Sequence, residues 1–251
     1  MPFLFTDRAG GVSAGPFASL NLGDHVSDDP AAVAANRQRL AATTGARPHF
    51  LRQVHGARVV TLGGEPREGL DADAPFSEQA GRPAVPSLLD EGGQPPAADA
   101  VVTDLPGNAL VVLVADCVPV VLVAPGAVGV AHAGRAGLAA GVVPATVAAL
   151  GALGASRQQV RAAIGPAVCG RCYEVPAAMR AAVDALVPGT ATTTRAGSPA
   201  LDLRAGVEAQ LRQSGVTDIT VSDQCTMEDR AFFSHRRDAG RTGRFAGVAW
   251  L

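Results

Sequence analysis

Three short apolar runs, each separated from the next by turn-forming residues, constrain the fold of this chain most strongly. They span residues 109–114, 118–123 and 127–131 and consist mainly of valine, leucine and alanine. Runs of this length that are rich in β-branched residues and bounded by turns such as Pro125-Gly126 predict adjacent, buried strands. Because helical patterns lie on both sides of them, the sequence predicts an α+β fold, a single domain with central mixed β-sheets flanked by helices.

Helix boundary signals are clearest over residues 29–45. Asp29 is a good N-cap, Pro30 suits the first helical position, and Gly45 follows the last apolar residues of the segment. Further helices are expected over 138–150, from about residue 175, and from Asp202 to Gly215, with strands at 161–164 and 219–221.

Residues 63–98 form a low-complexity stretch that is rich in proline, glycine and acidic residues. Such a stretch has little apolar surface to bury, so it is typical of an exposed insertion. A chain of 251 residues fits one large domain. Candidate functional residues lie on both sides of the stretch, so we interpret residues 1–251 as one domain with a surface insertion at about 63–98.

The composition excludes several classes of protein. The formal net charge is −2 and only 4% of the residues are aromatic, so neither a basic field nor stacking platforms favour nucleic acid binding. All 21 basic residues are arginine, because the chain contains no lysine. A lysine Schiff base and a lysine-containing phosphate loop are therefore both excluded.

The sequence shows no pattern of export or of membrane insertion. Its first ten residues lack a basic start followed by a long apolar stretch, and the longest apolar run contains Asp116 and Pro119. Four cysteines in a chain of this length do not form a disulfide framework. We therefore expect a cytoplasmic protein that binds no membrane.

Two histidines and one cysteine stand out by their context. His55 is followed by glycine, Cys117 lies between two of the apolar runs, and His132 ends the third run before two small residues. A thiolate with two imidazoles can hold Zn²⁺ and leaves the fourth tetrahedral position to a ligand. Alternatively, Cys117 is a nucleophile with His132 as its base, although the adjacent Asp116 would point away from the pair in a regular strand. The three residues can also be buried structural groups.

Three further features have both functional and structural interpretations. Cys169 and Cys172 form a CxxC pair, which occurs in redox and zinc sites, but without a second such pair we favour two incidental thiols in a turn. Four arginines lie within residues 236–244, where they can bind phosphate or carboxylate, or pair with surface aspartates. Asn21 lies near several glycines and can bind a polar ligand or hold a turn.

Several segments taken together resemble the YfiH family, whose members are also named laccase-like multicopper polyphenol oxidases and peptidoglycan editing factors. The matching segments, which run in order over nearly the whole chain, are GGVSAGPFASLNLGDHVSDDP, Asn36-Arg37, QVHG at 53–56, ADAVVTD at 98–104, ADCVPVVL at 115–122, AHAG at 131–134, IGPAVCGRCYEV at 164–175 and FFSHRRDAGRTGRFA at 232–246. No single segment is specific for the family, but the whole set in this order is.

The resemblance implies one zinc ion held by His55, Cys117 and His132, which would also form the catalytic site. It implies phosphorolysis of purine nucleosides such as adenosine, inosine and methylthioadenosine, accompanied by adenosine deaminase activity. The expected partners are therefore a nucleoside and phosphate, and the expected assembly is a monomer or a homodimer.

The resemblance also implies substrate or phosphate contacts at Asn21, Arg37, Gln53 and Arg135. Family members typically have Trp-Arg after the AHAG segment, whereas this chain has Arg135-Ala136, so the pocket differs there. Other hypotheses are a metal-dependent or cysteine amide hydrolase acting on peptidoglycan precursors, a copper polyphenol oxidase, and a metal-binding protein without turnover. The five histidines are too few for a full multicopper set.

Overall fold

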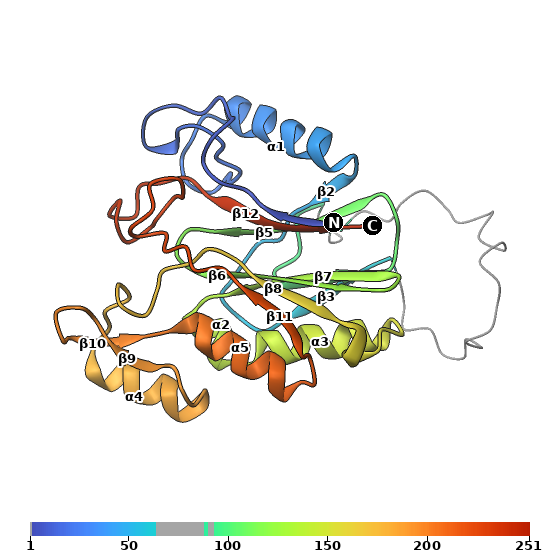
Figure 1. Ribbon diagram of the computed structural model, residues 1–251. Coiled ribbons are helices and arrows are strands. Elements are labelled where there is room, and N and C mark those ends of the chain that lie inside the picture. Colours follow the sequence, from blue (N-terminus) through green and yellow to red (C-terminus); the bar gives the residue numbers. More distant parts are fainter. Residues whose placement is uncertain (1, 64–87, 90–92) are drawn as a thin grey trace.

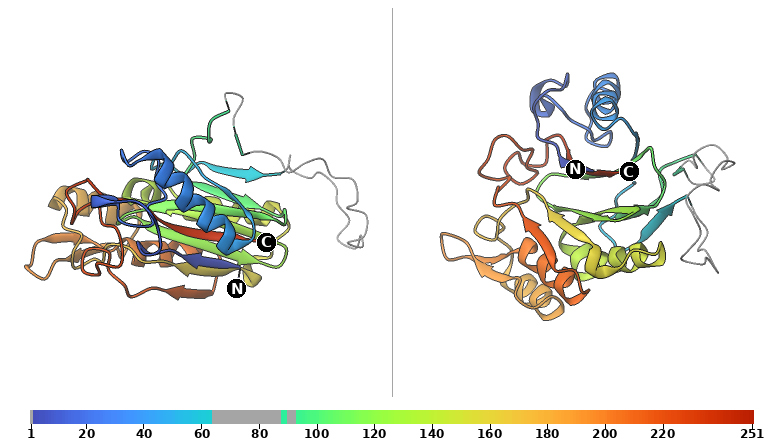
Figure 2. Two further views of the ribbon diagram at one scale, coloured as in Figure 1. Left: turned by 90° about the horizontal axis from the view of Figure 1, so that it is seen from above. Right: turned by 45° about the vertical axis from the view of Figure 1, so that its right-hand side comes forward.

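Two β-sheets pack face to face at the centre of the molecule, and helices cover the outer face of each sheet (Figure 1). The computed structural model describes residues 2–63, 88–89 and 93–251. The two further views in Figure 2 show the same layers from above and from the side. The predicted α+β single domain with mixed sheets flanked by helices is confirmed.

The larger sheet has six strands in the order β11-β8-β6-β7-β4-β3. The bounds of these strands are β3 Val59–Leu62, β4 Ala100–Thr103, β6 Val118–Ala124, β7 Ala127–Ala133, β8 Arg161–Ile164 and β11 Asp218–Val221. β6 and β7 form an antiparallel hairpin, and Gly126 in its turn has a φ of +73°, which glycine adopts without strain. The outer pairs β3–β4 and β8–β11 are parallel, so the sheet is mixed.

The smaller sheet has four strands in the order β1-β12-β5-β2. The bounds of these strands are β1 Phe3–Phe5, β2 Arg47–His49, β5 Asn108–Val114 and β12 Phe245–Trp250. β12 lies between β1 and β5 and is antiparallel to both. The two ends of the described chain therefore lie side by side (Figure 1).

Burial on both faces explains why the central strands have continuous apolar sequences. In β5, Leu110 and Val112 point into the layer between the sheets, where they pack with residues such as Val121 of the larger sheet. The alternate residues Val111 and Leu113 point outward and pack beneath α1. A strand with two covered faces needs no polar alternation, because successive side chains are buried in different layers.

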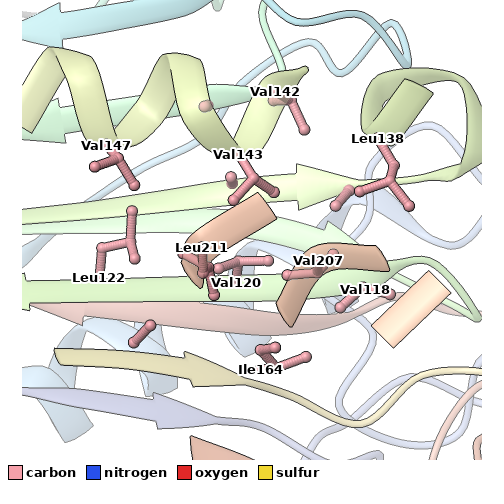
Figure 3. Packing of buried hydrophobic residues seen from close by; sticks show 14 of the residues in the cluster. Val118, Val120, Leu122, Leu138, Val142, Val143, Val147, Ile164, Val207 and Leu211 are labelled. Carbon is pink, nitrogen blue, oxygen red and sulfur yellow. The ribbon is translucent and has the colours of Figure 1, made fainter. Parts of the chain in front are cut away.

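The helices are divided between the outer faces. The bounds are α1 Pro30–Thr44, α2 Arg135–Ala139, α3 Val142–Ala152, α4 Ala177–Leu186 and α5 Leu203–Gln213, and the short hairpin of β9 Ala191–Thr193 and β10 Pro199–Leu201 lies beside α4. Helix α1 covers the smaller sheet, whereas α2, α3 and α5 cover the larger one. In the close view, Val143 and Val147 of α3 and Leu211 of α5 pack against Val120 and Leu122 of β6 (Figure 3).

The structure confirms several predicted elements and corrects one prediction. Asp29 caps α1 by accepting a hydrogen bond from the Ala31 N–H, and Gly45 ends the helix in the left-handed region, as predicted. The single helix expected over 138–150 is wrong, because Gly141 has a φ of +84° and separates α2 from α3. Strands β8 and β11 lie where strands are predicted.

The stretch at 63–98 lies largely outside the described residues. At its end, Ala98 is fully buried and Ala97 forms a parallel bridge with Arg52. Within the described residues, no helix is long and apolar enough to span a membrane.

Candidate metal site and cavity

Three loops and strand ends bring His55, Cys117 and His132 together. Cys117 immediately precedes β6 and His132 lies near the end of β7, so the pairing of these two strands places both residues at one edge of the larger sheet. His55 comes from the loop between β2 and β3. One nitrogen or sulfur atom from each residue lies within 4.8 Å of the other two, and Cys117 Sγ is 4.0 Å from His55 Nε2.

The buried carboxylate of Asp99 holds both histidines in place. His132 Nδ1 lies 2.8 Å from Asp99 Oδ1, while the backbone N–H groups of His55 and Gly56 donate to the same carboxylate at 2.9 and 2.7 Å. Asp99 is fully buried. Because Nδ1 of His132 is engaged, its Nε2 is the atom that can ligate, which is the usual arrangement around a metal-bound imidazole.

Local backbone geometry also serves this cluster. A Cβ atom on Gly134 would lie 2.9 Å from His55 Cδ2 and 3.0 Å from Cys117 Sγ, so only glycine lets the two side chains approach. Asp116 has a φ of +85°, an uncommon value for a residue other than glycine. Its carboxylate accepts hydrogen bonds from the Thr226 hydroxyl at 2.6 Å and the Arg236 N–H at 2.7 Å, which fix this turn before Cys117.

The proximity of Cys117 and His132 shifts the pKa of both groups. Burial disfavours the thiolate, yet the charge and hydrogen bond of His132 lower the pKa of Cys117 to about 6. Burial likewise disfavours the imidazolium, but the Cys117 thiolate and Asp99 raise the pKa of His132 to about 9. At neutral pH the metal-free group is therefore a thiolate–imidazolium pair.

The donor set fits a transition-metal ion. A thiolate and two imidazoles are borderline-soft ligands that suit Zn²⁺ and also match the His₂Cys set of blue copper. The close spacing of the three donors, the carboxylate behind His132 and the missing side chain at Gly134 all agree with ligation.

A cavity of about 680 Å³ opens beside this group. Four arginines line it, namely Arg37, Arg52, Arg236 and Arg244, together with Asp24 and Asp116, and its wall also includes Phe50, Tyr173 and the three candidate ligands. Because the Asp116 carboxylate is already bound to Thr226 and a backbone N–H, the charge of the cavity wall is mainly positive. The cavity is thus suited to an anion beside an aromatic group.

The cavity arginines differ in how far their hydrogen-bonding capacity is used. Arg37 donates to the Leu22 carbonyl, pairs with Asp24 at 3.1 Å and stacks on Phe50. Arg244 donates to two backbone carbonyls. Burial lowers the pKa of both guanidinium groups, so a bound anion would stabilise them.

Arg236 is a cavity arginine whose side-chain donors are available. Its guanidinium lies 4.8 Å from the centre of the Tyr173 ring and makes no hydrogen bond to any described residue. Burial and the thiolate charge of Cys117 raise the pKa of Tyr173, so its hydroxyl stays protonated at neutral pH.

The whole described chain matches a single protein family. The family described as multi-copper polyphenol oxidoreductase laccase matches residues 2–251. The chain belongs to this laccase family. A purine nucleoside phosphorylase of Streptomyces griseus is 51% identical over 254 residues, which cover 99% of this chain and 94% of that protein.

Solved structures of other bacterial proteins share the fold of this laccase-family chain. YlmD of Geobacillus stearothermophilus superposes with a TM-score of 0.81 at 35% identity, covering 99% of this chain and 91% of that one. The hypothetical protein YfiH of Bacillus licheniformis has a TM-score of 0.80 at 30% identity, covering 99% and 92% of the two chains. The resemblance to the YfiH family inferred from sequence motifs is confirmed.

Of the four residues expected to contact the substrate, two line the cavity and two do not. Arg37 and Gln53 line the cavity, and Gln53 also binds the backbone N–H and carbonyl of Leu113, so it extends the edge of β5. Arg135 lies at the start of α2, next to Tyr173, and is not a lining residue.

Asn21 is placed away from the cavity as a structural residue. It is fully buried, and its amide donates to the Gly23 carbonyl and to Asp28, while its oxygen accepts from the N–H groups of Gly23 and Arg244. These four bonds use the full capacity of the side chain, so a ligand has nothing left to bind. Through the last bond Asn21 positions Arg244 in the cavity wall.

Sequence reasoning did not single out Asp99 or Tyr173. Asp99 directly precedes the apolar residues of a strand in the ADAVVTD segment, and it is fully buried. The available sequence signal was an acidic residue next to an apolar run. The arginine-rich segment 236–244 is divided: Arg236 and Arg244 reach the cavity, whereas Arg237 donates to the carbonyls of Thr226 and Phe232 and holds its own loop.

Proposed function

We propose that this laccase-family chain is a zinc-dependent purine nucleoside phosphorylase with accompanying adenosine deaminase activity. The observation that carries the proposal is the group of His55, Cys117 and His132 at the wall of an arginine-lined cavity. The names of relatives at 43–51% identity, all purine nucleoside phosphorylases, support the same activity. A cytoplasmic location, where thiols stay reduced, would suit this site.

Phosphorolysis requires a place for an anion and a place for a purine. Phosphate attacks C1′ of the ribose, the bond between C1′ and the base breaks, and the products are the free base and ribose 1-phosphate. We assign phosphate binding to Arg236, whose donors are available, with Arg244 adding positive charge. Guanidinium groups hold phosphate through paired N–H donors, and they would stabilise charge that develops during the transfer.

The base requires an apolar surface and a proton donor. Phe50 and Tyr173 line the cavity, and the raised pKa of Tyr173 keeps its hydroxyl available to donate to the departing purine. His55, Cys117 and His132 would hold Zn²⁺, which when bound supplies a Lewis acid that polarises a substrate or solvent oxygen. The deaminase activity would use the same cavity: water would attack C6 of the adenine ring of adenosine, the bond between C6 and the amino nitrogen would break, and the products would be inosine and ammonia.

The test combines metal content with product analysis. We expect zinc in the purified protein and phosphate-dependent formation of adenine and ribose 1-phosphate from adenosine, with inosine as the deamination product. Cys117→Ala and the volume-preserving Cys117→Ser should both lose the metal at this site and at least a hundredfold of each activity. A variant that loses zinc but keeps full phosphorolysis would disprove a catalytic metal.

A matched pair of arginine variants tests the anion site. Arg236→Lys keeps the charge but loses the paired donors, whereas Arg236→Met loses both. We expect the KM for phosphate to rise in both variants, more in Arg236→Met, while the KM for adenosine changes little. Equal KM values for phosphate in the wild type and both variants would refute the assignment.

Copper-dependent oxidation of phenols is a second candidate, because the family carries that description. Among the described residues only His55 and His132 share the group with Cys117, and a set of several coppers needs more imidazoles. Copper in the purified protein, together with oxygen consumption on a phenol, would favour oxidation. Zinc with no phenol oxidation would eliminate it.

A further inference from the structure

A second group of potential metal ligands lies outside the cavity. Cys169, Cys172, Cys225 and Glu228 each offer one sulfur or carboxylate oxygen atom, and these four atoms lie within 4.8 Å of one another. Four donors around one tetrahedral zinc would lie about 3.8 Å apart, given Zn–S bonds of about 2.3 Å. The prediction that the CxxC pair consists of incidental thiols overlooked two partners that are more than 50 residues away in the sequence.

The four donors come from two turns of the same kind. Cys172 N–H donates to the Cys169 carbonyl at 2.9 Å, and Glu228 N–H donates to the Cys225 carbonyl at 3.0 Å. Each turn thus presents two ligands three residues apart, in the pattern Cys-x-x-Cys and Cys-x-x-Glu. Two such turns facing one another are typical of closed structural zinc sites.

Backbone contacts dock the two turns against each other. Ala167 and Cys225 form a parallel bridge, and the Thr226 N–H donates to the Ala167 carbonyl at 3.2 Å. The Cys169 N–H points at Cys225 Sγ at 3.3 Å. An N–H group directed at sulfur stabilises a thiolate, and such second contacts are typical of metal-bound cysteines. Cys169 and Cys225 are buried, whereas Cys172 is half-buried and Glu228 is exposed.

The surrounding charge fits a bound dication. Three thiolates and one carboxylate carry four negative charges, so a divalent ion leaves a net charge of about −2. Arg195 contacts both Glu228 and Cys172 and offsets part of that charge. Glu228 can bind Arg195 through one oxygen and the ion through the other, because a carboxylate has four acceptor positions.

We propose that Cys169, Cys172, Cys225 and Glu228 form a structural Zn²⁺ site, distinct from the group at the cavity. Four protein donors close the coordination sphere, so this ion has no position for a substrate. A disulfide would use only two of the three thiols and would leave the third thiol and Glu228 without a common partner. The proposal goes beyond the proposed function, since no residue of the cavity group takes part.

The position of the site gives it a role in the cavity wall. Tyr173 follows the first turn directly, and Thr226, which binds the Asp116 carboxylate, lies in the second turn. An ion that joins the turns would therefore hold Tyr173 and the Asp116 turn in a fixed relation. Its loss should loosen the wall without removing any ligand of the cavity group.

The test counts metal ions in protein reconstituted with ZnCl₂ under reducing conditions and then desalted. We expect two zinc ions per wild-type chain and one in Cys225→Ser or Glu228→Ala. Cys117→Ser should also retain one ion, and the double variant Cys117→Ser/Cys225→Ser none. With Co²⁺ as the probe, the ion in Cys117→Ser should show stronger thiolate charge-transfer absorption than the ion in Cys225→Ser, because three sulfurs bind it.

The wild-type measurements keep the proposal falsifiable even where a variant does not fold. One zinc per chain, or three thiols that react with a thiol reagent as fast in zinc-loaded as in metal-free native protein, would overturn it. A Cys169–Cys172 or Cys169–Cys225 disulfide in protein purified without oxidant would overturn it as well. Two ions per chain with a failed activity assay would leave this site standing and refute only the proposed function.

Discussion

At the scale of single residues, Asp99 organises the candidate metal site although it does not line the cavity. One buried carboxylate orients His132 and also binds the backbone on both sides of His55, so it couples the two imidazoles. Burial opposes its ionisation, but the hydrogen bonds from His132 and Gly56 keep its pKa below the usual value. The negative charge of Asp99 therefore holds the two candidate metal-binding histidines in place without lining the cavity itself.

Replacing Asp99 by asparagine should weaken metal binding at the cavity about 10–100-fold. The amide keeps the size of the side chain but directs an NH₂ group at a backbone N–H or at His132. The dissociation constant for zinc, measured by competition with a chelator, checks the prediction. Asp218→Asn on β11, which removes an exposed pairing with Arg161 of β8, is the matched control and should leave the constant unchanged.

Zinc affinity at the cavity should rise with pH between about 6 and about 9. In this range the metal-free site holds a Cys117 thiolate and a His132 imidazolium. Because the ion binds only neutral imidazole, it displaces one proton, and the affinity should rise about tenfold per pH unit. Below about pH 6 the thiol proton must also leave, so the slope should steepen. Titrations of Cys225→Ser protein isolate this site, and a flat profile would contradict the assignment.

Gly134→Ala should abolish tight metal binding at the cavity while the protein remains folded. The added Cβ meets His55 and Cys117 at 3.0 Å or less, so the ligands must move apart. Gly151→Ala is the control, because its Cβ meets nothing within 4 Å at the end of α3. We expect the control to keep its zinc and to gain up to about 1 kcal/mol of stability. Equal metal content in the two variants would contradict the prediction.

At the scale of elements, the sequence was informative where an element carries its own boundary signals. The Asp29 cap, Pro30 and Gly45 define α1, and burial on both faces makes β5, β6 and β7 visible as apolar runs. Strands β1 and β2 have three residues each, so they depend on neighbours that are distant in sequence.

The same distinction applies to the candidate sites. His55, Cys117 and His132 could be named from their local contexts, next to small residues or at the ends of apolar runs. Asp99 and the pairing of the CxxC turn with Cys225 could not, because contacts across the fold define them. The hydrogen bond between Asn21 and Arg244 is of the same kind, since 223 residues separate the two in the sequence.

The loop before α1 depends on Asn21, and Asn21→Ala should destabilise the protein by about 2–6 kcal/mol. The change leaves the buried N–H groups of Gly23 and Arg244 without acceptors, and each unsatisfied group costs about 1–3 kcal/mol. The midpoint of urea unfolding, with an unchanged slope, measures this loss. Ser156→Ala is the control, because the Ser156 hydroxyl makes only an exposed hydrogen bond to Gln158, and it should shift the midpoint little. An unchanged midpoint in Asn21→Ala would contradict the structural role of Asn21.

At the scale of the whole molecule, bound zinc should raise thermal stability, because the ligands are assembled only in the folded chain. With free zinc at a hundred times its dissociation constant, one site contributes about 2.7 kcal/mol. For a chain of this size that corresponds to a rise in Tm of roughly 5–11 °C. Calorimetry of metal-free and reloaded protein checks this value, with Mg²⁺ as a control that prefers oxygen ligands. An unchanged Tm would show that zinc does not bind the native state preferentially.

The position of β12 sets an order of events during synthesis on the ribosome. Residues 245–250 emerge after all other strands, yet they form the strand between β1 and β5. Until then β1 has no neighbour in its sheet, and the open edge of β5 can recruit another nascent chain. A stop codon just before β12 would therefore leave every proposed metal ligand in the product, yet the smaller sheet would lack the strand that joins β1 to β5.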